Sequence, residues 1–236
     1  MDWNQKTTEA IIRLGLLLLT SCQAPTPPIS SSNKEAYQLD TFVERNNPAA
    51  LDLTQHQLFI DTTRDSEFYQ NLTHWQPPKY NKRDVQTYLT TLTKAHQPKK
   101  MNWGNFPTAF VEIHQQGEEF IVYDRCDGID TRYELRDSAV IFYGPLESDA
   151  AIIKQLLYPN NKGIKLELYT PRSDSNIGVA TLAITPTKMD FIYQLEYKDE
   201  YLIRQHYIIP IEAIPNFDLL VNHCPNTKVT EYPPLY

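Results

Sequence analysis

The sequence predicts a mainly β protein of the α+β class, with an antiparallel sheet curled into a sandwich or open barrel and about two helices. Its 236 residues include 15 tyrosines but only 7 glycines, which favours ordered strands over a flexible chain. Beyond Trp103, short apolar segments alternate with turn-forming residues. They follow one another too closely for parallel crossovers, so antiparallel pairing is expected.

The first element is an apolar run that ends in a cysteine. Residues 16–19 are all leucine, and Thr20, Ser21 and Cys22 follow them. This run resembles the lipobox of bacterial lipoproteins. The resemblance implies that residues 1–21 are a signal peptide and that Cys22 becomes the first mature residue, carrying a diacylglyceryl thioether and an acylated amino group.

Lipidation of this kind implies a protein of the cell envelope. Two or three acyl chains together anchor a protein almost permanently, so no transmembrane helix is needed. In the enteric branch of the family, an aspartate after the cysteine commonly retains the protein on the inner membrane. Gln23 stands at that position, which favours the outer membrane and a domain facing the periplasm.

Residues 22–35 are expected to form the lipidated end and a tether, and residues 36–236 a single β-rich globular domain. The tether has three prolines and a run of serines, so it has little to bury. The remaining length is typical of one domain with a proper core.

Two helices are predicted within the domain. From Asn81 to His96 the apolar residues recur at helical spacing, and Asn81 with Asp84 resembles a capping box. A second helix is expected from Ser148, as N-cap, to Tyr158, before Pro159.

The strands are predicted from apolar segments bounded by turn residues. Gln116-Gly117 and Asp127-Gly128 are hairpin signals, and residues 198–200 make a tight connection. The expected strands are Thr108–His114, Glu119–Cys126, Thr131–Arg136, Ala139–Tyr143, Ile164–Thr170, Val179–Thr185, Phe191–Tyr197 and Tyr201–Ile209, with Phe217–Cys224 either pairing or simply packing.

Two cysteines remain once Cys22 is lipidated. Because thiols outside the cytoplasm tend to be oxidised, Cys126 and Cys224 are expected to form an intramolecular disulfide. Two unpaired buried cysteines are the alternative, since sequence does not supply their separation.

The charge balance argues against nucleic acid as a partner. The formal net charge is -7, and the only adjacent basic residues are the pairs Lys82-Arg83 and Lys99-Lys100. Nucleic acids and anionic lipid surfaces require clustered Lys and Arg.

No metal, cofactor or catalytic site is predicted. Asp124, Asp127 and Asp130 lack the alternating spacing of a calcium loop and are better explained by a turn. No two of the six histidines have the spacing of a zinc protease, and no Gly-x-Ser-x-Gly turn occurs. Paired carboxylates acting on glycans are left open, because such groups meet only in the fold.

One candidate recognition face is predicted on two adjacent strands near the end of the chain. Tyrosine-rich sheet faces are used for recognition, although they also occur as ordinary amphipathic core edges. The tyrosines concerned are Tyr193, Tyr197, Tyr201 and Tyr207.

These observations favour a lipid-anchored envelope protein that binds without catalysis. The first hypothesis is a protein partner, either a component of envelope assembly or a toxin that is neutralised, as by immunity proteins of similar anchor, size and charge. The second is a carrier of a lipid or other hydrophobic ligand, which predicts an unfilled apolar cavity. The third, an envelope hydrolase, predicts a polar cleft with converging carboxylates or histidines.

Overall fold

The computed structural model describes residues 43–126, 129–145, 147–160, 163–172 and 176–225. These residues belong to one compact unit, Phe42–Tyr236. The expected signal peptide, Cys22 and the tether lie outside the described residues. No helix in the described ranges is long and apolar enough to span a membrane.

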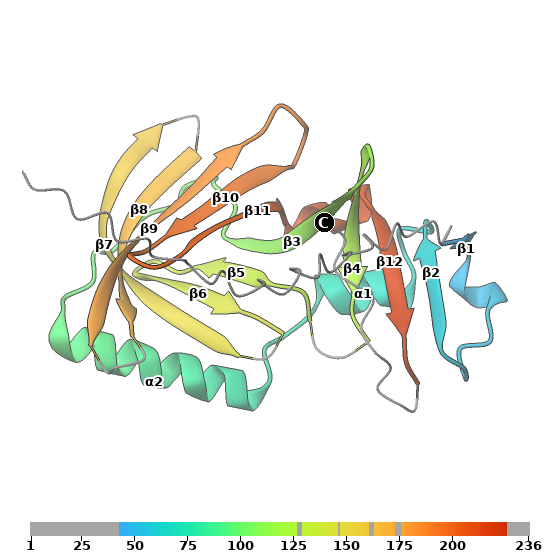
Figure 1. Cartoon of the computed structure of the whole chain (residues 1–236), viewed down its shortest axis with the longest axis horizontal. Coiled ribbons are helices and arrows are strands. Elements are labelled where there is room, and N and C mark those ends of the chain that lie inside the picture. The colour runs from blue at the N-terminus through green and yellow to red at the C-terminus, as the bar shows by residue number, and fades with distance from the viewer. Residues whose placement is uncertain (1–42, 127–128, 146, 161–162, 173–175, 226–236) are drawn as a thin grey trace, which may run out of the picture. The chain divides into compact units, whose positions relative to one another are not determined.

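Eight of the described strands form a closed antiparallel barrel, which confirms the mainly β class and the antiparallel pairing (Figure 1). Around the barrel each strand pairs with the next, and β3 pairs with β5 to close the circle. In this order the strands are β3 (Ala109–Gln116), β5 (Arg132–Leu135), β6 (Ala139–Tyr143), β7 (Ser148–Asn160), β8 (Gly163–Pro171), β9 (Ile177–Pro186), β10 (Tyr193–Lys198) and β11 (Ile203–Pro210).

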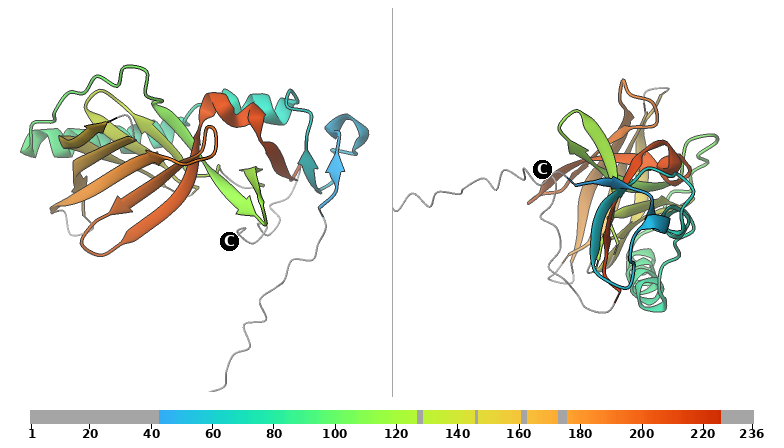
Figure 2. Two further views of the ribbon diagram at one scale, coloured as in Figure 1. Left: turned by 90° about the horizontal axis from the view of Figure 1, so that it is seen from above. Right: turned by 90° about the vertical axis from the view of Figure 1, so that its right-hand side faces the viewer.

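A smaller sheet continues from the barrel through the far half of β3. It holds β4 (Glu119–Asp124), β12 (Asp218–His223), β2 (Gln57–Asp61) and the short β1 (Arg45–Asn46), with the 3-10 helix η1 (Pro48–Ala50) after β1. The helix α1 (Glu67–Thr73) and the 3-10 helix η2 (Ile211–Asn216) lie side by side against this sheet (Figure 2). The elements β1, β2 and α1 were not predicted from the sequence.

The longest helix, α2 (Lys79–Ala95), packs along the outside of the barrel. Val85 contacts Ile141 and Ala150 in a separate apolar cluster. The predicted capping box is wrong, because the helix begins at Lys79 after Pro78, with no side-chain cap. Asn81 is instead buried and donates its amide to the Ser148 hydroxyl.

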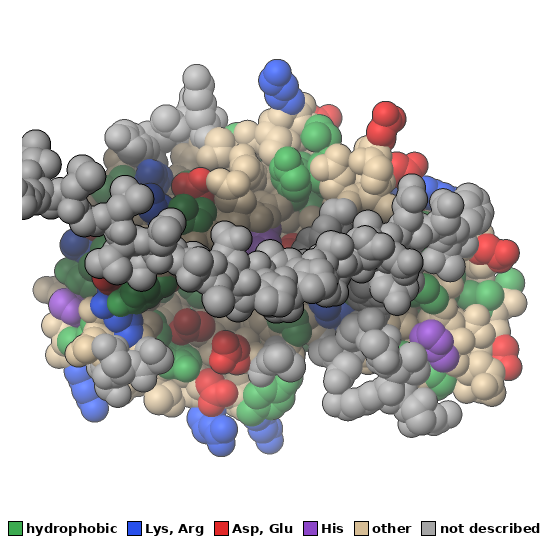
Figure 3. Space-filling view, viewed as in Figure 1, with side chains coloured by type: hydrophobic (Ala, Val, Ile, Leu, Met, Phe, Trp, Pro, Cys, Tyr) green, Lys and Arg blue, Asp and Glu red, His purple; other side chains and the backbone are tan. Residues whose placement is uncertain are grey.

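The surface carries mixed charges. On the described part of the face in Figure 3, basic and acidic side chains lie among apolar and neutral ones, without a continuous patch of one sign.

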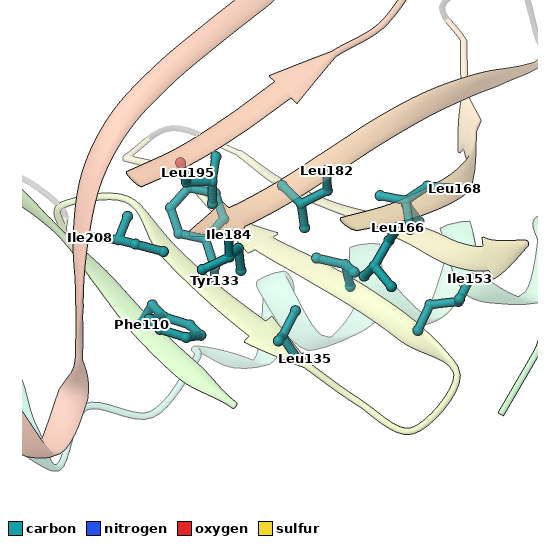
Figure 4. Close-up of a cluster of buried hydrophobic side chains, with 12 residues drawn as sticks. Phe110, Tyr133, Leu135, Ile153, Leu166, Leu168, Leu182, Ile184, Leu195 and Ile208 are labelled. Carbon is teal, nitrogen blue, oxygen red and sulfur yellow. The ribbon is translucent and has the colours of Figure 1, made fainter. Parts of the chain in front are cut away.

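The barrel interior is filled for most of its length by apolar side chains, which come from alternate positions of successive strands (Figure 4). Thus β8 contributes Leu166 and Leu168, and β9 contributes Leu182 and Ile184. At one end, Met101, Trp103 and Phe106 pack against this cluster just before β3 begins. The Trp103 indole N–H also donates to the Arg136 carbonyl at 3.1 Å. This end of the barrel is therefore closed.

The predicted helix Ser148–Tyr158 is wrong, because these residues form strand β7. Both faces of β7 are buried: Ala151 and Ile153 point into the barrel, while Ala150 packs under α2. A strand buried on both faces reads as a continuous apolar run, which periodicity does not separate from a helix.

One predicted hairpin is confirmed and the other is wrong. Gly117 has a positive φ of 62° in the turn between the paired strands β3 and β4. A hairpin at Asp127-Gly128 would pair β4 with β5, but each of these strands pairs with β3 instead. Asp127 and Gly128 themselves lie outside the described residues.

Candidate functional site

The end of the barrel opposite the Met101, Trp103 and Phe106 plug is open and holds a cavity of about 470 Å³. It lies where β5, β7 and β11 begin and where β6, β8 and β10 end. Its walls are formed by Thr131, Tyr133, Phe142, Gly144, Pro145, Glu147, Asp149, Ala151, Thr170, Pro171, Leu195, Tyr197, Asp199, Leu202, Arg204 and His206.

The inner part of the cavity is apolar and aromatic. Leu195 and Ala151 belong to the core cluster that fills the barrel below. The Phe142 ring lies edge-on to both Tyr133 and Tyr197, with 5.8 Å between ring centres in each pair. A ligand entering here would meet aromatic faces and aliphatic side chains.

Charged groups of both signs enter the same cavity. Register places Arg204 opposite Tyr197, two residues from His206 on the inward face of β11. On β7, Asp149 also points into the cavity, two residues before the inward-facing Ala151. The Asp149 side chain is open to the cavity but surrounded by protein on most sides, and this enclosure, with the charge of Glu147, raises the pKa of Asp149 to about 6.

Two tyrosines stand beside these charges. Burial raises the pKa of Tyr197 to about 12, and the negative charges of Asp199 and Asp149 add to the effect. Burial also raises the pKa of Tyr133 well above its ordinary value, with Glu112 adding to the shift and Arg204 opposing it. Both phenols are therefore neutral hydrogen-bonding groups at physiological pH.

A histidine–carboxylate contact joins the cavity lining to strand β3. His206 Nδ1 is 3.0 Å from the Glu112 carboxylate. Burial alone would raise the pKa of Glu112, but the hydrogen bond and charge of His206 outweigh it and lower the pKa. His206 and Glu112 are thus hydrogen-bonding partners of each other.

Beyond Glu112, the next inward residue of β3 belongs to a second buried pair. His114 Nε2 lies 2.5 Å from Asp130, which also accepts hydrogen bonds from Arg125 at 3.1 and 3.2 Å. Burial alone would lower the pKa of His114, but Asp130 outweighs it and raises the pKa.

The rim of the cavity is tied together across two loops. Arg172, after β8, pairs with Glu200 and places its guanidinium 5.6 Å from the Tyr201 ring centre. Asp199 accepts hydrogen bonds from the backbone N–H of Tyr201 and Leu202, both at 2.8 Å. The β10–β11 turn therefore holds Leu202 at the cavity mouth.

The predicted tyrosine face is not one surface. Tyr193 and Tyr197 pack inside the barrel, whereas Tyr207 lies on its outer side against Phe120. Tyr201 lies in the turn and is 79% exposed. Alternation along β10 and β11 separates these tyrosines, because neighbouring positions point to opposite faces.

The structure joins Cys126 and Cys224 in a disulfide, with 5.4 Å between their Cα atoms. The two cysteines meet because β4 and β12 are parallel neighbours, and each cysteine follows the end of its strand. The lipidation site, Cys22, lies outside the described residues.

The aspartates considered for calcium have other surroundings. Asp130 is fully buried with Arg125 and His114, and Asp127 lies outside the described residues. Within the ranges that the structure describes, no three His, Cys, Asp or Glu side chains come together as a metal site.

Of the residues that line this cavity, the sequence pointed only to Tyr197, as part of a recognition face, and to Asp199, as part of the tight connection at residues 198–200. The available signal was polar side chains at inward positions of apolar strands, such as Asp149, Arg204 and His206. Comparison of the chain with models of protein families, with curated proteins and with solved structures gives no match.

Proposed function

We propose that this protein binds a small amphiphilic molecule in the open end of the barrel, without transforming it. The observation that carries this proposal is the shape of the barrel: closed at one end by Met101, Trp103 and Phe106, and open at the other into a cavity of about 470 Å³. Cavities of roughly 300–1,000 Å³ are typical of small-molecule sites.

The lining favours a ligand with both an apolar body and polar groups. Phe142 and Leu195 offer apolar contact, while Asp149 and Arg204 offer charge. A purely hydrocarbon ligand would leave these charges desolvated without compensation. The carrier hypothesis from the sequence is therefore proposed in a modified form, with an amphiphile in place of a simple lipid.

We propose binding rather than catalysis because the described cavity lacks an activated nucleophile. His206 is paired with the Glu112 carboxylate, and no described Ser, Thr or Cys side chain of the cavity is hydrogen bonded to a histidine. Activation by an adjacent general base is a common route for a hydroxyl or thiol nucleophile, and the described cavity does not show it.

From its lipobox-like sequence, we also propose that Cys22 is lipidated and that the barrel is held at the outer membrane, facing the periplasm. A protein partner is a second candidate, favoured by the apolar side chains exposed at the β10–β11 turn. Tyr201 is 79% and Ile203 59% exposed there.

The test is native mass spectrometry of the full-length protein purified from its host, with two tryptophan variants. Leu202→Trp narrows the cavity mouth, whereas Ile203→Trp alters the next exposed residue, which does not line the cavity. We expect wild type and Ile203→Trp to retain a small molecule and Leu202→Trp to lose it. Equal retention by all three, or no retained molecule in any, would overturn the proposal.

A further inference from the structure

Two oppositely charged side chains face each other across the cavity. Asp149 lies on β7 and Arg204 on β11, and both line the cavity. In the closed order of strands, β7 and β11 are four strands apart in either direction around the barrel. They therefore form opposing walls, one carrying a carboxylate and the other a guanidinium.

Neither charge has a counterion among the described residues. Asp149 accepts one hydrogen bond, from the Ala150 backbone N–H at 2.7 Å, and no described carboxylate lies within ion-pair distance of Arg204. Two other charged groups of the lining are engaged: His206 pairs with Glu112, and Asp199 accepts backbone hydrogen bonds from the β10–β11 turn. Glu147 also lines the cavity, and its charge acts on Asp149, so the β7 side of the cavity carries a second carboxylate. Asp149 and Arg204 thus stand on separate walls, and neither has an ion-pair partner among the described residues.

Each unpaired charge stands beside an aromatic ring. Strand register places Phe142 of β6 opposite Asp149 and Tyr197 of β10 opposite Arg204. An ammonium group near Asp149 would have both a carboxylate and an aromatic surface around it, the usual surroundings of bound cations. A carboxylate near Arg204 would receive paired N–H donors, with the Tyr133 hydroxyl close by.

We propose that the ligand is a zwitterion of about dipeptide size, whose ammonium group binds Asp149 and whose carboxylate binds Arg204. An apolar side chain of the ligand would lie against Phe142 and Leu195. An anion alone would leave Asp149 unpaired, and a cation alone would leave Arg204 unpaired; only a molecule with both charges satisfies both walls. This inference rests on the proposed function of the cavity and specifies its ligand class.

The test is calorimetric titration of the full-length protein with alanyl-phenylalanine and three blocked forms: N-acetylated, C-amidated and blocked at both ends. We expect the free dipeptide to bind best, and each single block to weaken binding by about tenfold or more, since each removes a charge-assisted contact.

Variants assign each end of the dipeptide to a wall. In Asp149→Asn, acetylation should no longer matter, while amidation still weakens binding; in Arg204→Gln the pattern should reverse. The matched controls are Glu196→Gln and Lys198→Gln, which remove the same charges from the neighbouring strand without touching the cavity lining. They should bind as wild type does.

Failure of this inference is distinguishable from failure of the proposed function. If the protein retains a small molecule but binds free and blocked dipeptides equally, or binds none of them, the zwitterion inference is wrong and the cavity still binds a ligand. If no molecule is retained and no dipeptide binds, both are wrong.

Discussion

Arg132 and Trp75 stack in the interior, with the guanidinium carbon 4.9 Å from the ring centre. Arg132 is only 2% exposed and donates one hydrogen bond, at 2.9 Å, to the Leu72 carbonyl at the end of α1. Its Nε and Nη1 atoms have no hydrogen-bond partner in the described residues. Burial lowers the pKa of Arg132 to about 10, although Asp130 and Asp124 oppose the shift.

Arg132 contributes packing more than charge. Replacing a buried cation with an apolar side chain of similar length removes a desolvation penalty, so Arg132→Met should leave the free energy of unfolding within about 1 kcal/mol of wild type. Arg132→Ala should lose about 2–4 kcal/mol, because it leaves a cavity beside Trp75. Urea unfolding measures both, and an equal loss in the two variants would show that the Leu72 hydrogen bond dominates.

The disulfide should matter for stability because it closes a long loop. Cys126 and Cys224 are separated by 98 residues, and removing a bridge of this span typically costs about 2–5 kcal/mol. The double variant Cys126→Ser/Cys224→Ser should show this loss in denaturant, and reduced wild type should match it. A double variant as stable as the oxidised protein would contradict the pairing.

The His114–Asp130 pair makes stability depend on pH. The pKa of His114 is raised in the folded state above its ordinary value of 6.5, so the protonated imidazole stabilises the fold. That contribution is complete below pH 6.5 and is lost as the pH rises through the folded pKa. The stability difference between wild type and His114→Gln should therefore shrink from pH 6 to pH 9, and a difference that grows would contradict the account.

Asp149 should act in the opposite pH direction. Its pKa of about 6 in the folded state lies above the ordinary 3.8, so the ionised carboxylate destabilises the empty protein. The cost is present in full above pH 6 and disappears as the pH falls below 3.8. Asp149→Asn should be more stable than wild type at pH 7.5 and equal to it near pH 3.8. Carboxyl NMR would measure the pKa itself, and an ordinary value would refute this prediction.

Two glycines with positive φ should respond differently to alanine. A Cβ on Gly163, whose φ is 120°, would lie 2.2 Å from the Ile184 carbonyl oxygen, whereas one on Gly117, whose φ is 62°, would meet nothing within 4 Å. Gly117→Ala should cost about 1 kcal/mol from the backbone alone. Gly163→Ala should lower the free energy of unfolding by more than this, because β8 and β9 would have to separate to admit the Cβ. Equal thermal unfolding temperatures for the two variants would argue against the β8–β9 register.

The barrel strands were predictable from sequence where turn residues bound a short segment, and this holds even for β6, which is buried on both faces. The exact match of β6, Ala139–Tyr143, and the near match of β8 and β9 follow from segments bounded by turn residues. The strand β7 was misread because it is a run of 13 residues buried on both faces, whose apolar residues also fit helical spacing.

The cavity was not predictable because its opposing charges, Asp149 and Arg204, come from different parts of the chain. Asp149 and Arg204 come to line one cavity, on opposing walls, only through closure of the barrel, which depends on the pairing of β3 with β5. The same strand β3 pairs with β4, so the local Asp127-Gly128 turn signal gave the wrong partner. Strand β1 is two residues long and carries no periodic signal at all.

A crystal structure of the protein, purified from its host under native conditions, tests the central claim most directly. The account predicts density for a small molecule in the open end of the barrel, in contact with Asp149 on one wall and Arg204 on the other. A cavity that holds only water, or that is closed by its own side chains, would contradict it.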